Sequence, residues 1–426
     1  MTVSAKKDSA GKLALLGIQH VFAMFGATVL VPMLTGMSPA VALFCAGVGT
    51  WIFHLCTGRK VPTFLGSSFA FIAAIQGAAQ ICSDNAEIGT DAYLAALPYA
   101  TGGIIVAGAL YLVLALLVRL VGAERVRSFF PPIVTGPVVT IIGLMLAPSA
   151  INNITTQIGT VNVGLNWLVA AVAVAAIFVT SLFAKGLFKL VPILIGIIVG
   201  YVAAICCGMV DFTTIAQAPW LDLPPFFLPK FDMRAIGLVA PIAIVTFVEH
   251  IGDVTASSAV VGKDFIKDPG LHRSLFADNF STMISGFIGS VPTTTYGENI
   301  GVMAITKVYS VRVIGGAAVL SIICSFVGPL AALIQTIPGP VIGGISFLLY
   351  GMIGTSGLRI LVDNHVDYSK NRNMILTSVI FVTGLSGVTL ALGDVSLSGM
   401  TLAAIVGMIM SLVFYAFDKF HLSNDA

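Results

Sequence analysis

The sequence predicts an all-α polytopic membrane protein that crosses the bilayer fourteen times, and three observations predict this class. Of its 426 residues, 57% are hydrophobic and only 9% are charged, whereas soluble domains carry about 25% charged residues. Its apolar runs are continuous and about 20 residues long, the length of a membrane-spanning helix, and lack the alternation of a transmembrane β-barrel. Its two halves also repeat each other.

The apolar runs define the expected spans in chain order. Short loops separate them, and no linker or soluble domain interrupts them before a short C-terminal tail. The spans lie roughly at residues 14–35, 38–56, 62–82, 94–119, 129–147, 164–184, 189–210, 235–261, 271–290, 292–309, 313–336, 338–359, 373–392 and 396–417.

Basic residues are distributed unevenly over the loops. When successive loops are assigned to alternate sides, 19 of the 21 Lys and Arg residues fall on one side, and Lys230 and Arg234 fall on the other. Cytoplasmic loops carry the excess of Lys and Arg. We therefore expect the protein to lie in the cytoplasmic membrane with both of its termini in the cytoplasm. The scattered basic residues give no indication of nucleic-acid binding. The basic side includes Lys6, Lys7, Arg59, Lys60, Arg125, Arg127, Lys263, Lys267 and Arg372.

Two sequence echoes indicate an internal repeat. Residues 61–71 (VPTFLGSSFAF) and 291–301 (VPTTTYGENIG) occupy the third span of each half, and both begin Val-Pro-Thr. Residues 131–138 (PPIVTGPV) and 338–345 (PGPVIGGI) occupy the fifth. Each half has seven spans, and because seven is an odd number, the second half enters the membrane from the opposite face. The pattern therefore predicts 7+7 inverted repeats, as in many secondary transporters.

Each third span is expected to be half strand and half helix. Pro292 ends any preceding helix, and the β-branched and aromatic residues after it favour extended backbone. Non-helical backbone at membrane depth must be buried or line a cavity, so segments 64–68 and 293–297 should pair as short antiparallel strands. Because the two segments lie against each other, we expect no space for a larger side chain at Gly297. The half-helix after it, over 298–309, would present free N–H groups to carbonyl oxygens or anions.

Four acidic residues fall inside the proposed spans: Glu249, Asp253, Asp278 and Glu298. Inserting such a carboxylate costs roughly 3 kcal/mol or more, which makes each a candidate functional residue. Glu249 and Asp253 are four residues apart and share a helix face, and Glu298 lies in the first turn of a half-helix. Two carboxylates in a poorly solvated site favour protonation. Asp253 is therefore the first candidate for a proton switch, followed by Glu249 and Glu298, whereas Asp278 could act instead as a hydrogen-bonding residue between helices.

Other polar residues have two possible roles. Gln19 and His20, early in the first span, could contact a substrate or support the site by hydrogen bonding across helices. Tyr350 could be a gate contact or a packing residue, and His250, about 100° from Glu249 around the helix, should face elsewhere. No HExxH, Walker A or nucleophile-elbow motif is present, and the six cysteines lack metal-ligand spacing. The sequence therefore predicts no enzyme, no metal site and no cofactor.

These residues resemble the nucleobase–ascorbate transporter family, also called nucleobase–cation symporters. Residues 298–307 (ENIGVMAITK) look like the family signature, and residues 19–20 (QH), 66–71 (GSSFAF), 249–253 (EHIGD) and 271–310 match family members. The resemblance implies a 7+7 fold divided into two domains. The core domain would comprise residues 10–120 and 234–336, and the gate domain residues 125–212 and 337–418.

Within the family the resemblance is strongest to bacterial uracil permeases. It implies secondary-active uracil uptake by a homodimer, coupled to protons or, alternatively, to sodium. The base would lie between the half-helices, with Glu249 and Glu298 accepting its ring N–H groups and backbone N–H groups near Phe69 and Gly297 donating to its carbonyls. By the same resemblance, Tyr296 and Tyr350 would line the site. Gln19, His20, Ser67, Ser68 and Asn299 would support it.

One departure leaves alternatives open. A uracil–proton symporter of this family has His where this chain has Asp253, and purine-transporting members often have Asp. A xanthine or urate permease of the same family therefore remains an alternative. A passive nucleobase channel and an anion exchanger of related fold are the others, although half-helix dipoles and carboxylates at one point favour binding over free flux.

Overall fold

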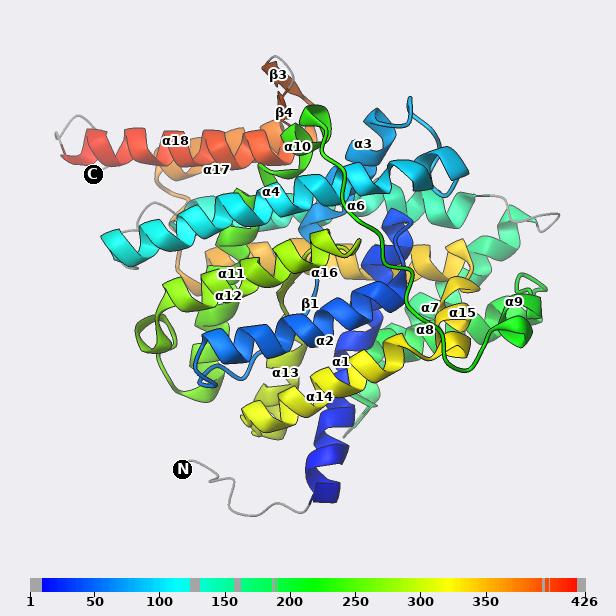
Figure 1. Ribbon diagram of the computed structural model, residues 1–426. Coiled ribbons are helices and arrows are strands. Elements are labelled where there is room, and N and C mark those ends of the chain that lie inside the picture. Colours follow the sequence, from blue (N-terminus) through cyan, green and yellow to red (C-terminus); the bar gives the residue numbers. More distant parts are fainter. Residues whose placement is uncertain are drawn as a thin grey trace.

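The computed structural model describes residues 10–122, 131–156, 162–185, 188–189, 191–392, 395–397 and 399–419. Lys6, Lys7, Arg125 and Arg127 of the predicted basic side lie outside the described residues, as does the expected tail after residue 419. Figure 1 shows long helices side by side, most of them running in nearly the same direction, with the short strand β1 in their midst.

The described residues of the first half form mainly α-helices, together with the strand β1 and the 3-10 turn η1. Short loops and proline-led helix starts separate the elements: Ser38, for example, caps a helix whose first residue is Pro39. The elements are α1 (Ala10–Thr35), α2 (Pro39–Cys56), β1 (Leu65–Ser67), η1 (Phe69–Phe71), α3 (Ile72–Ile81), α4 (Asp91–Val121), α6 (Pro132–Thr155), α7 (Val163–Phe183), α8 (Pro192–Cys206) and α9 (Thr213–Gln217).

The second half has the same character and adds a hairpin near its end. Its elements are α10 (Met233–Val239), α11 (Ile242–Val261), the turn η3 (Ile266–Gly270), α12 (Leu271–Phe287), β2 (Thr293–Thr295), α13 (Gly297–Thr306), α14 (Val311–Ser325), α15 (Gly328–Gln335), α16 (Gly339–Asp363), α17 (Asn371–Leu385), β3 (Leu390–Leu392), β4 (Val395–Leu397) and α18 (Gly399–Lys419).

The helix lengths confirm a polytopic helical membrane protein. Among the described residues, eight helical segments are long and apolar enough to cross a bilayer, and each overlaps one of the predicted spans. Three further apolar helices are shorter, at Phe69–Ile81, Pro192–Cys206 and Val311–Ser325. The eight long segments are Leu16–Thr35, Pro39–Cys56, Asp91–Val121, Pro132–Thr155, Val163–Phe183, Met233–Val261, Gly339–Asp363 and Gly399–Phe417.

Three predicted helical segments break or end earlier than the sequence analysis expected. The span expected at 235–261 breaks between α10 and α11, where Pro241 has no N–H to continue the helix. The half-helix expected over 298–309 ends at Thr306, because Lys307 adopts a left-handed conformation with φ of 56°. The span expected at 373–392 ends as a helix at Leu385, and its last residues form strand β3 of the hairpin.

The pairing of β1 with β2 confirms the predicted antiparallel pairing of segments 64–68 and 293–297. The strands are antiparallel, and all six of their residues are buried. Two bonds extend the ladder beyond them: the Tyr296 N–H donates to the Phe64 carbonyl at 3.1 Å, and the Ser68 N–H donates to the Pro292 carbonyl at 2.9 Å. The backbone groups that lipid could not satisfy are thus paired within the protein. The register is Leu65 with Thr295, Gly66 with Thr294, and Ser67 with Thr293.

A glycine sets the close approach of these strands. The ring of Tyr296 lies over Gly66, where a Cβ atom would come within 2.3 Å of it. At Gly297, by contrast, a Cβ atom would meet no atom within 4 Å. The expectation that Gly297 lacks room was therefore wrong, because the crowded position of the pair is Gly66.

The helices pack in two groups. Helices α1 to α4 pack mainly against one another and against α12 and α14, whereas α6, α7, α8, α16, α17 and α18 pack mainly against one another. In the second group glycines bring α6 and α16 into contact: a Cβ atom at Gly143 would lie 2.2 Å from the Tyr350 carbonyl oxygen. Helix α11 contacts both groups, since it touches α4 and α13 as well as α6 and α18.

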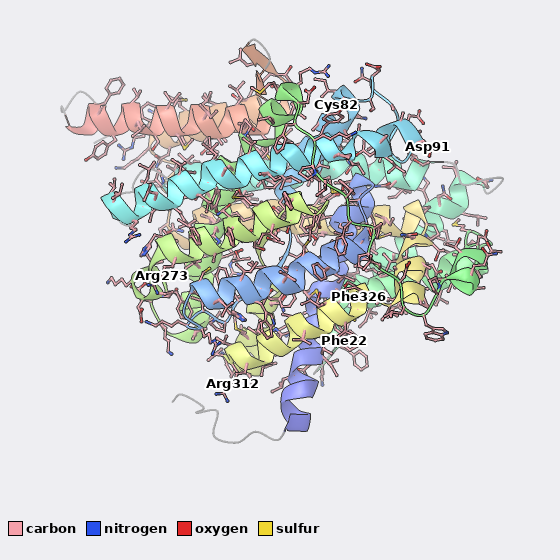
Figure 2. The ribbon with its side chains drawn as sticks, viewed as in Figure 1. Phe22, Cys82, Asp91, Arg273, Arg312 and Phe326 are labelled. Atoms are coloured by element: carbon pink, nitrogen blue, oxygen red, sulfur yellow. The ribbon has the colours of Figure 1, made fainter. Side chains whose placement is uncertain are left out.

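Charged residues mark the two ends of the bundle. Arg273 and Arg312 lie towards one end of the helices, and Asp91 lies towards the other, near Cys82 (Figure 2). The sequence analysis assigns these residues to opposite sides of the membrane, and that assignment stays a prediction.

Candidate functional site

Two helices begin where the paired strands end. Ser68, before η1, and Tyr296, before α13, both have extended backbone, and neither side chain caps the helix that follows. The first N–H groups of a helix have no partner within the helix itself. The strand pair therefore brings two uncapped helix starts into the middle of the protein, an arrangement suited to binding carbonyl oxygens or anions.

The carboxylates predicted separately from the sequence gather around these helix starts. Glu249 and Asp253 lie one turn apart on α11, and Glu298 lies in the first turn of α13. Helix α11 packs against α13, so the two helices bring these carboxylates to the same part of the protein. Glu249, Asp253 and Glu298 are half-buried, and Oε2 of Glu249 is buried without a hydrogen-bond partner among the described residues. The structure thus supplies an acceptor with unused capacity.

Thr295 holds Asp253 in place. Its hydroxyl donates a hydrogen bond of 2.6 Å to Oδ2 of Asp253, which joins β2 to α11. The sequence analysis missed Thr295, although its position in the extended segment next to Tyr296 could have drawn attention to it.

Three glycines near the carboxylates in the sequence adjoin unfilled space. Cβ atoms added at Gly252 on α11, or at Gly297 and Gly301 on α13, would meet no atom within 4 Å, and all three glycines are exposed. These glycines flank Asp253 and Glu298 in sequence. Open space therefore lies at glycines close in sequence to Asp253 and Glu298.

Asn299 and His20 join α13 to α1. The Asn299 amide donates to the His20 carbonyl at 3.2 Å and lies 3.0 Å from Nδ1 of the His20 ring. Both residues are buried. Gln19 precedes this contact, and its Oε1 has no hydrogen-bond partner among the described residues. The contact fixes α13 against α1, and the supporting role of His20 and Asn299 at a substrate site stays a prediction.

Ser67 and Tyr296 brace the strand pair. The Tyr296 hydroxyl donates to the Ser67 carbonyl at 3.1 Å and accepts from the Thr28 hydroxyl at 3.3 Å, while the Ser67 hydroxyl donates to the Thr28 carbonyl at 2.8 Å. Ser68 is buried with a hydroxyl that has no partner among the described residues, and Phe69 is half-buried at the start of η1. Direct contact of Tyr296 and Phe69 with a substrate stays a prediction.

Tyr350 lies apart from this network. It is buried in α16, in the second helix group, where α16 packs against α6. No hydrogen bond recorded for the described residues joins it to Glu249 or Glu298, so its role at the gate also stays a prediction.

His250 faces away from Glu249, as expected from its angle around the helix. Its Nδ1 lies 3.2 Å from Oδ2 of Asp278 on α12, and its Nε2 lies 3.0 Å from the Ser274 hydroxyl. Asp278 therefore links α12 to α11, the interhelical role weighed for it above. Across the described part of the chain, no three His, Cys, Asp or Glu side chains are grouped so that they could hold a metal ion.

An apolar cavity of about 70 Å³ adjoins Phe69. Its walls come from both helix groups, with Ala73 of α3 on one side and Met145 of α6 and Met400 of α18 on the other. The two groups are thus incompletely packed against each other beside the start of η1.

A family comparison agrees with this geometry. Residues 11–393 match the model of the family described as "Permease family". The chain belongs to this permease family. Its matched residues include the strand pair, both helix starts and all four buried or half-buried carboxylates.

Individual relatives of this permease are similar over nearly their whole length. This chain is 46% identical over 416 residues to a uracil permease of Paenibacillus larvae, and the alignment covers 96% of each of the two chains. It is 45% identical over 403 residues to a uracil permease of Escherichia coli K12, covering 94% of this chain and 90% of the relative. Such relatives are transporters rather than enzymes, and so is this membrane permease.

Solved structures of low sequence identity share its fold. The murine anion transporter Slc26a9 in the inward-facing state superposes with a TM-score of 0.70 at 13% identity, covering 97% of this chain and 69% of that one. The transmembrane domain of the cyanobacterial bicarbonate transporter BicA superposes with a TM-score of 0.61 at 14% identity. The match covers 95% of this chain and 98% of that domain. This permease therefore has a membrane-transporter fold of that type.

Proposed function

We propose that this permease is a secondary-active uracil transporter of the bacterial cytoplasmic membrane. The observation that carries the proposal is the unpartnered carboxylate oxygen of Glu249 on α11, a helix that packs against α13, whose uncapped start at Gly297 has Glu298 in its first turn. Uracil presents ring N–H donors flanked by carbonyl acceptors. Carboxylates complement the donors, and helix N–H groups complement the acceptors. The relatives named uracil permeases support the same substrate.

The proposed architecture has fourteen spans in 7+7 inverted repeats. Strand β1 with η1 and α3 would make one span, and β2 with α13 another, so short helices also cross the membrane. The core would comprise residues 10–120 and 234–336 and the gate residues 125–212 and 337–418. The packing of the helices in two groups and the cavity between them support movement of one against the other.

The proposed coupling ion is the proton, with Asp253 as the switch. Its bond from Thr295 links the charge state of the carboxylate to strand β2, which leads directly into α13. Protonation of Asp253 would weaken that charge-assisted bond and so favour a different position of the strand. Sodium is the alternative coupling ion. The proposed assembly is a homodimer with both termini in the cytoplasm.

Binding of labelled uracil to the purified permease in detergent tests the substrate. We expect saturable binding that unlabelled uracil abolishes and xanthine does not. The alternative function, a xanthine or urate permease, is favoured by the presence of Asp253. It predicts that unlabelled xanthine binds and that uracil does not compete with it. Absence of uracil binding at neutral pH, in a sample that unfolds cooperatively on heating, would refute the proposed substrate.

A further inference from the structure

An extended segment of the chain, the strap (residues 218–232), joins α9 to α10. Figure 1 shows it as the thin green trace that runs across the helices rather than along them. The strap forms neither helix nor strand, apart from one isolated antiparallel bridge between Leu221 and Val327.

Backbone hydrogen bonds fasten the strap to the ends of two helices. The Asp222 N–H donates to the carbonyl of Phe326, the residue after α14, at 2.9 Å. The Phe227 N–H donates to the carbonyl of Ile288, the residue after α12, at 3.4 Å. Carbonyls at the end of a helix lack partners within that helix. The strap therefore supplies donors that these two helix ends need.

The strap also packs closely against α4. The Lys230 N–H donates to the Pro98 carbonyl at 2.8 Å, and a Cβ atom added at Gly102 would overlap the Lys230 carbonyl oxygen. The Lys230 ammonium lies over the ring of Tyr99, 5.6 Å from its centre. The strap is thus a fixed part of the protein surface.

The length of α4 indicates the depth at which the strap lies. Helix α4 has 31 residues, and its charged residues are Asp91 in the first turn and Arg119 in the last. At ~1.5 Å per residue such a helix is about 46 Å long, whereas the hydrocarbon layer is about 30 Å thick. When the uncharged stretch is centred on the hydrocarbon, the boundary at the Asp91 end falls within about a turn or two of Pro98. The strap therefore crosses α4 at this boundary.

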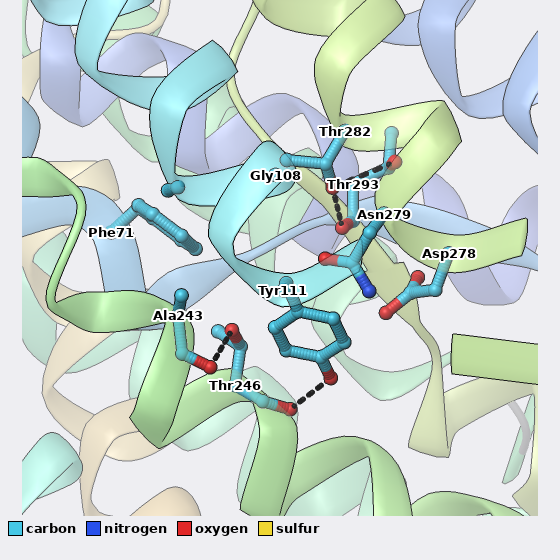
Figure 3. Close-up of a pocket in the computed structure, with 10 residues that line it drawn as sticks. Phe71, Gly108, Tyr111, Ala243, Thr246, Asp278, Asn279, Thr282 and Thr293 are labelled. Atoms are coloured by element: carbon cyan, nitrogen blue, oxygen red, sulfur yellow. Dashed lines mark hydrogen bonds between the residues drawn. The ribbon is translucent and has the colours of Figure 1, made fainter. Parts of the chain in front are cut away.

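Helix α12 ends at the same depth. It runs antiparallel to α4: a Cβ atom at Gly108 would lie 3.2 Å from the Asn279 carbonyl oxygen, and one at Gly286 would lie 3.0 Å from the Thr101 carbonyl oxygen. Figure 3 shows Gly108 and Asn279 where the two helices border a small polar cavity. The last residues of α12 are therefore level with the turn of α4 near Pro98, where the strap joins both helices.

Large apolar side chains of the strap are exposed. Their exposed fractions range from 39% for Phe226 to 84% for Trp220. Irregular backbone is not tolerated against hydrocarbon, whereas tryptophan is enriched at the boundary between hydrocarbon and headgroups. The composition of the strap therefore fits this boundary better than either water or the hydrocarbon. The exposed apolar residues are Trp220, Leu221, Leu223, Phe226, Leu228 and Phe231.

We propose that the strap is a lipid-binding surface in the leaflet at the Asp91 end of the bundle. Its apolar side chains enter the outermost part of the acyl chains, and the ammonium group of Lys230 faces the lipid phosphates. The strap thereby fastens the ends of α4, α12 and α14 to one level of the bilayer. This surface does not depend on which substrate the permease carries.

The fluorescence of Trp220 in liposomes tests this placement. Trp51→Phe with Trp167→Phe leaves Trp220 as the single tryptophan of the chain. Phospholipids brominated near the headgroup end of their acyl chains should quench it more strongly than phospholipids brominated near the methyl end. Acrylamide in the water should quench it only weakly. The control is a single tryptophan made by Ile88→Trp, at an exposed loop position before α4, which should respond mainly to acrylamide.

Three results would overturn the proposal. Quenching of Trp220 by acrylamide as strong as in the control would place the strap in water. Stronger quenching by bromine near the methyl end would place it inside the hydrocarbon. Resistance to both kinds of quencher would show that protein covers the strap, such as a second copy of the chain.

A second measurement covers the case in which the single-tryptophan protein does not fold. The difference in lipid-bromine quenching between the wild type and Trp220→Phe reports on Trp220. Gly328→Ala, whose Cβ atom would overlap the Pro219 carbonyl oxygen, should displace the strap and reduce the wild-type quenching. Gly316→Ala, whose Cβ atom would meet no atom within 4 Å, is the matched control and should not. Equal quenching of the wild type and Trp220→Phe would contradict the proposal.

Discussion

The hydroxyl of Thr295 donates a hydrogen bond of 2.6 Å to the carboxylate of Asp253. Thr295 also pairs with Leu65 in the strand ladder. The charge of a carboxylate on α11 therefore acts directly on the strand pair from which both half-helices start. This contact places a protonatable group and the proposed base-binding groups in one connected structure.

Asp253→Asn should separate exchange from accumulation. The amide imitates the permanently protonated carboxylate, so the variant should exchange uracil across a membrane but should not concentrate it when a pH gradient is imposed. Uptake of labelled uracil into proteoliposomes, with and without the gradient, measures both properties. Thr295→Ser, which keeps the hydroxyl donor, should still accumulate. Gradient-driven accumulation by Asp253→Asn would move the switch to Glu249 or Glu298.

Glu298→Gln should weaken uracil binding. The change keeps the shape of the side chain but replaces one acceptor oxygen with an NH₂ donor that faces a ring N–H. A mismatched polar group in a desolvated site costs about 1–3 kcal/mol, so the Kd should rise roughly 5- to 150-fold. Equilibrium binding measures the change, and Glu87→Gln, at an exposed loop position, is the control. An unchanged Kd would remove Glu298 from the site.

Gly297→Leu should abolish transport and leave the protein folded. The added side chain meets no protein atom near its Cβ position, so it would occupy the space next to Glu298 that the base is expected to use. Transport in proteoliposomes and Tm of the purified variant give the two readouts. A wild-type transport rate would show that the base does not approach Gly297.

Gly66→Ala should have the opposite profile and destabilise the fold. Its Cβ atom would lie 2.3 Å from the Tyr296 ring, which is held by hydrogen bonds to Ser67 and Thr28. Overpacking of this kind costs about 1–3 kcal/mol, so the Tm should fall by several degrees. Gly297→Ala is the matched control and should leave the Tm unchanged. Equal Tm values for both variants would contradict the described packing.

The strand pair could be predicted because its signals are local. Pro292 and the β-branched residues after it restrict the backbone by themselves, and the Val-Pro-Thr echo indicated the partner strand. The β3–β4 hairpin was missed, because residues 388–397 read as the edges of two apolar spans, and hydropathy alone does not separate a short strand from the end of a helix.

The sequence identified the charged residues of the candidate site but not the residues that contact them. Four carboxylates inside apolar spans are costly wherever they lie, so the sequence alone identifies them. Their partners depend on tertiary contacts between distant segments: Thr295 reaches Asp253 across 42 positions, and Asp278 reaches His250 from the next helix. The crowding at Gly66, rather than at Gly297, likewise depends on where the Tyr296 ring lies, which no local pattern reveals.

Counterflow of labelled uracil in proteoliposomes tests the account most directly. Vesicles loaded with unlabelled uracil and diluted into labelled uracil should accumulate label transiently in the absence of any ion gradient. Empty vesicles should accumulate uracil when an inwardly directed proton gradient is imposed. Equilibration of label without any transient accumulation, unchanged by proton or sodium gradients, would contradict carrier-type uracil transport and indicate a passive channel.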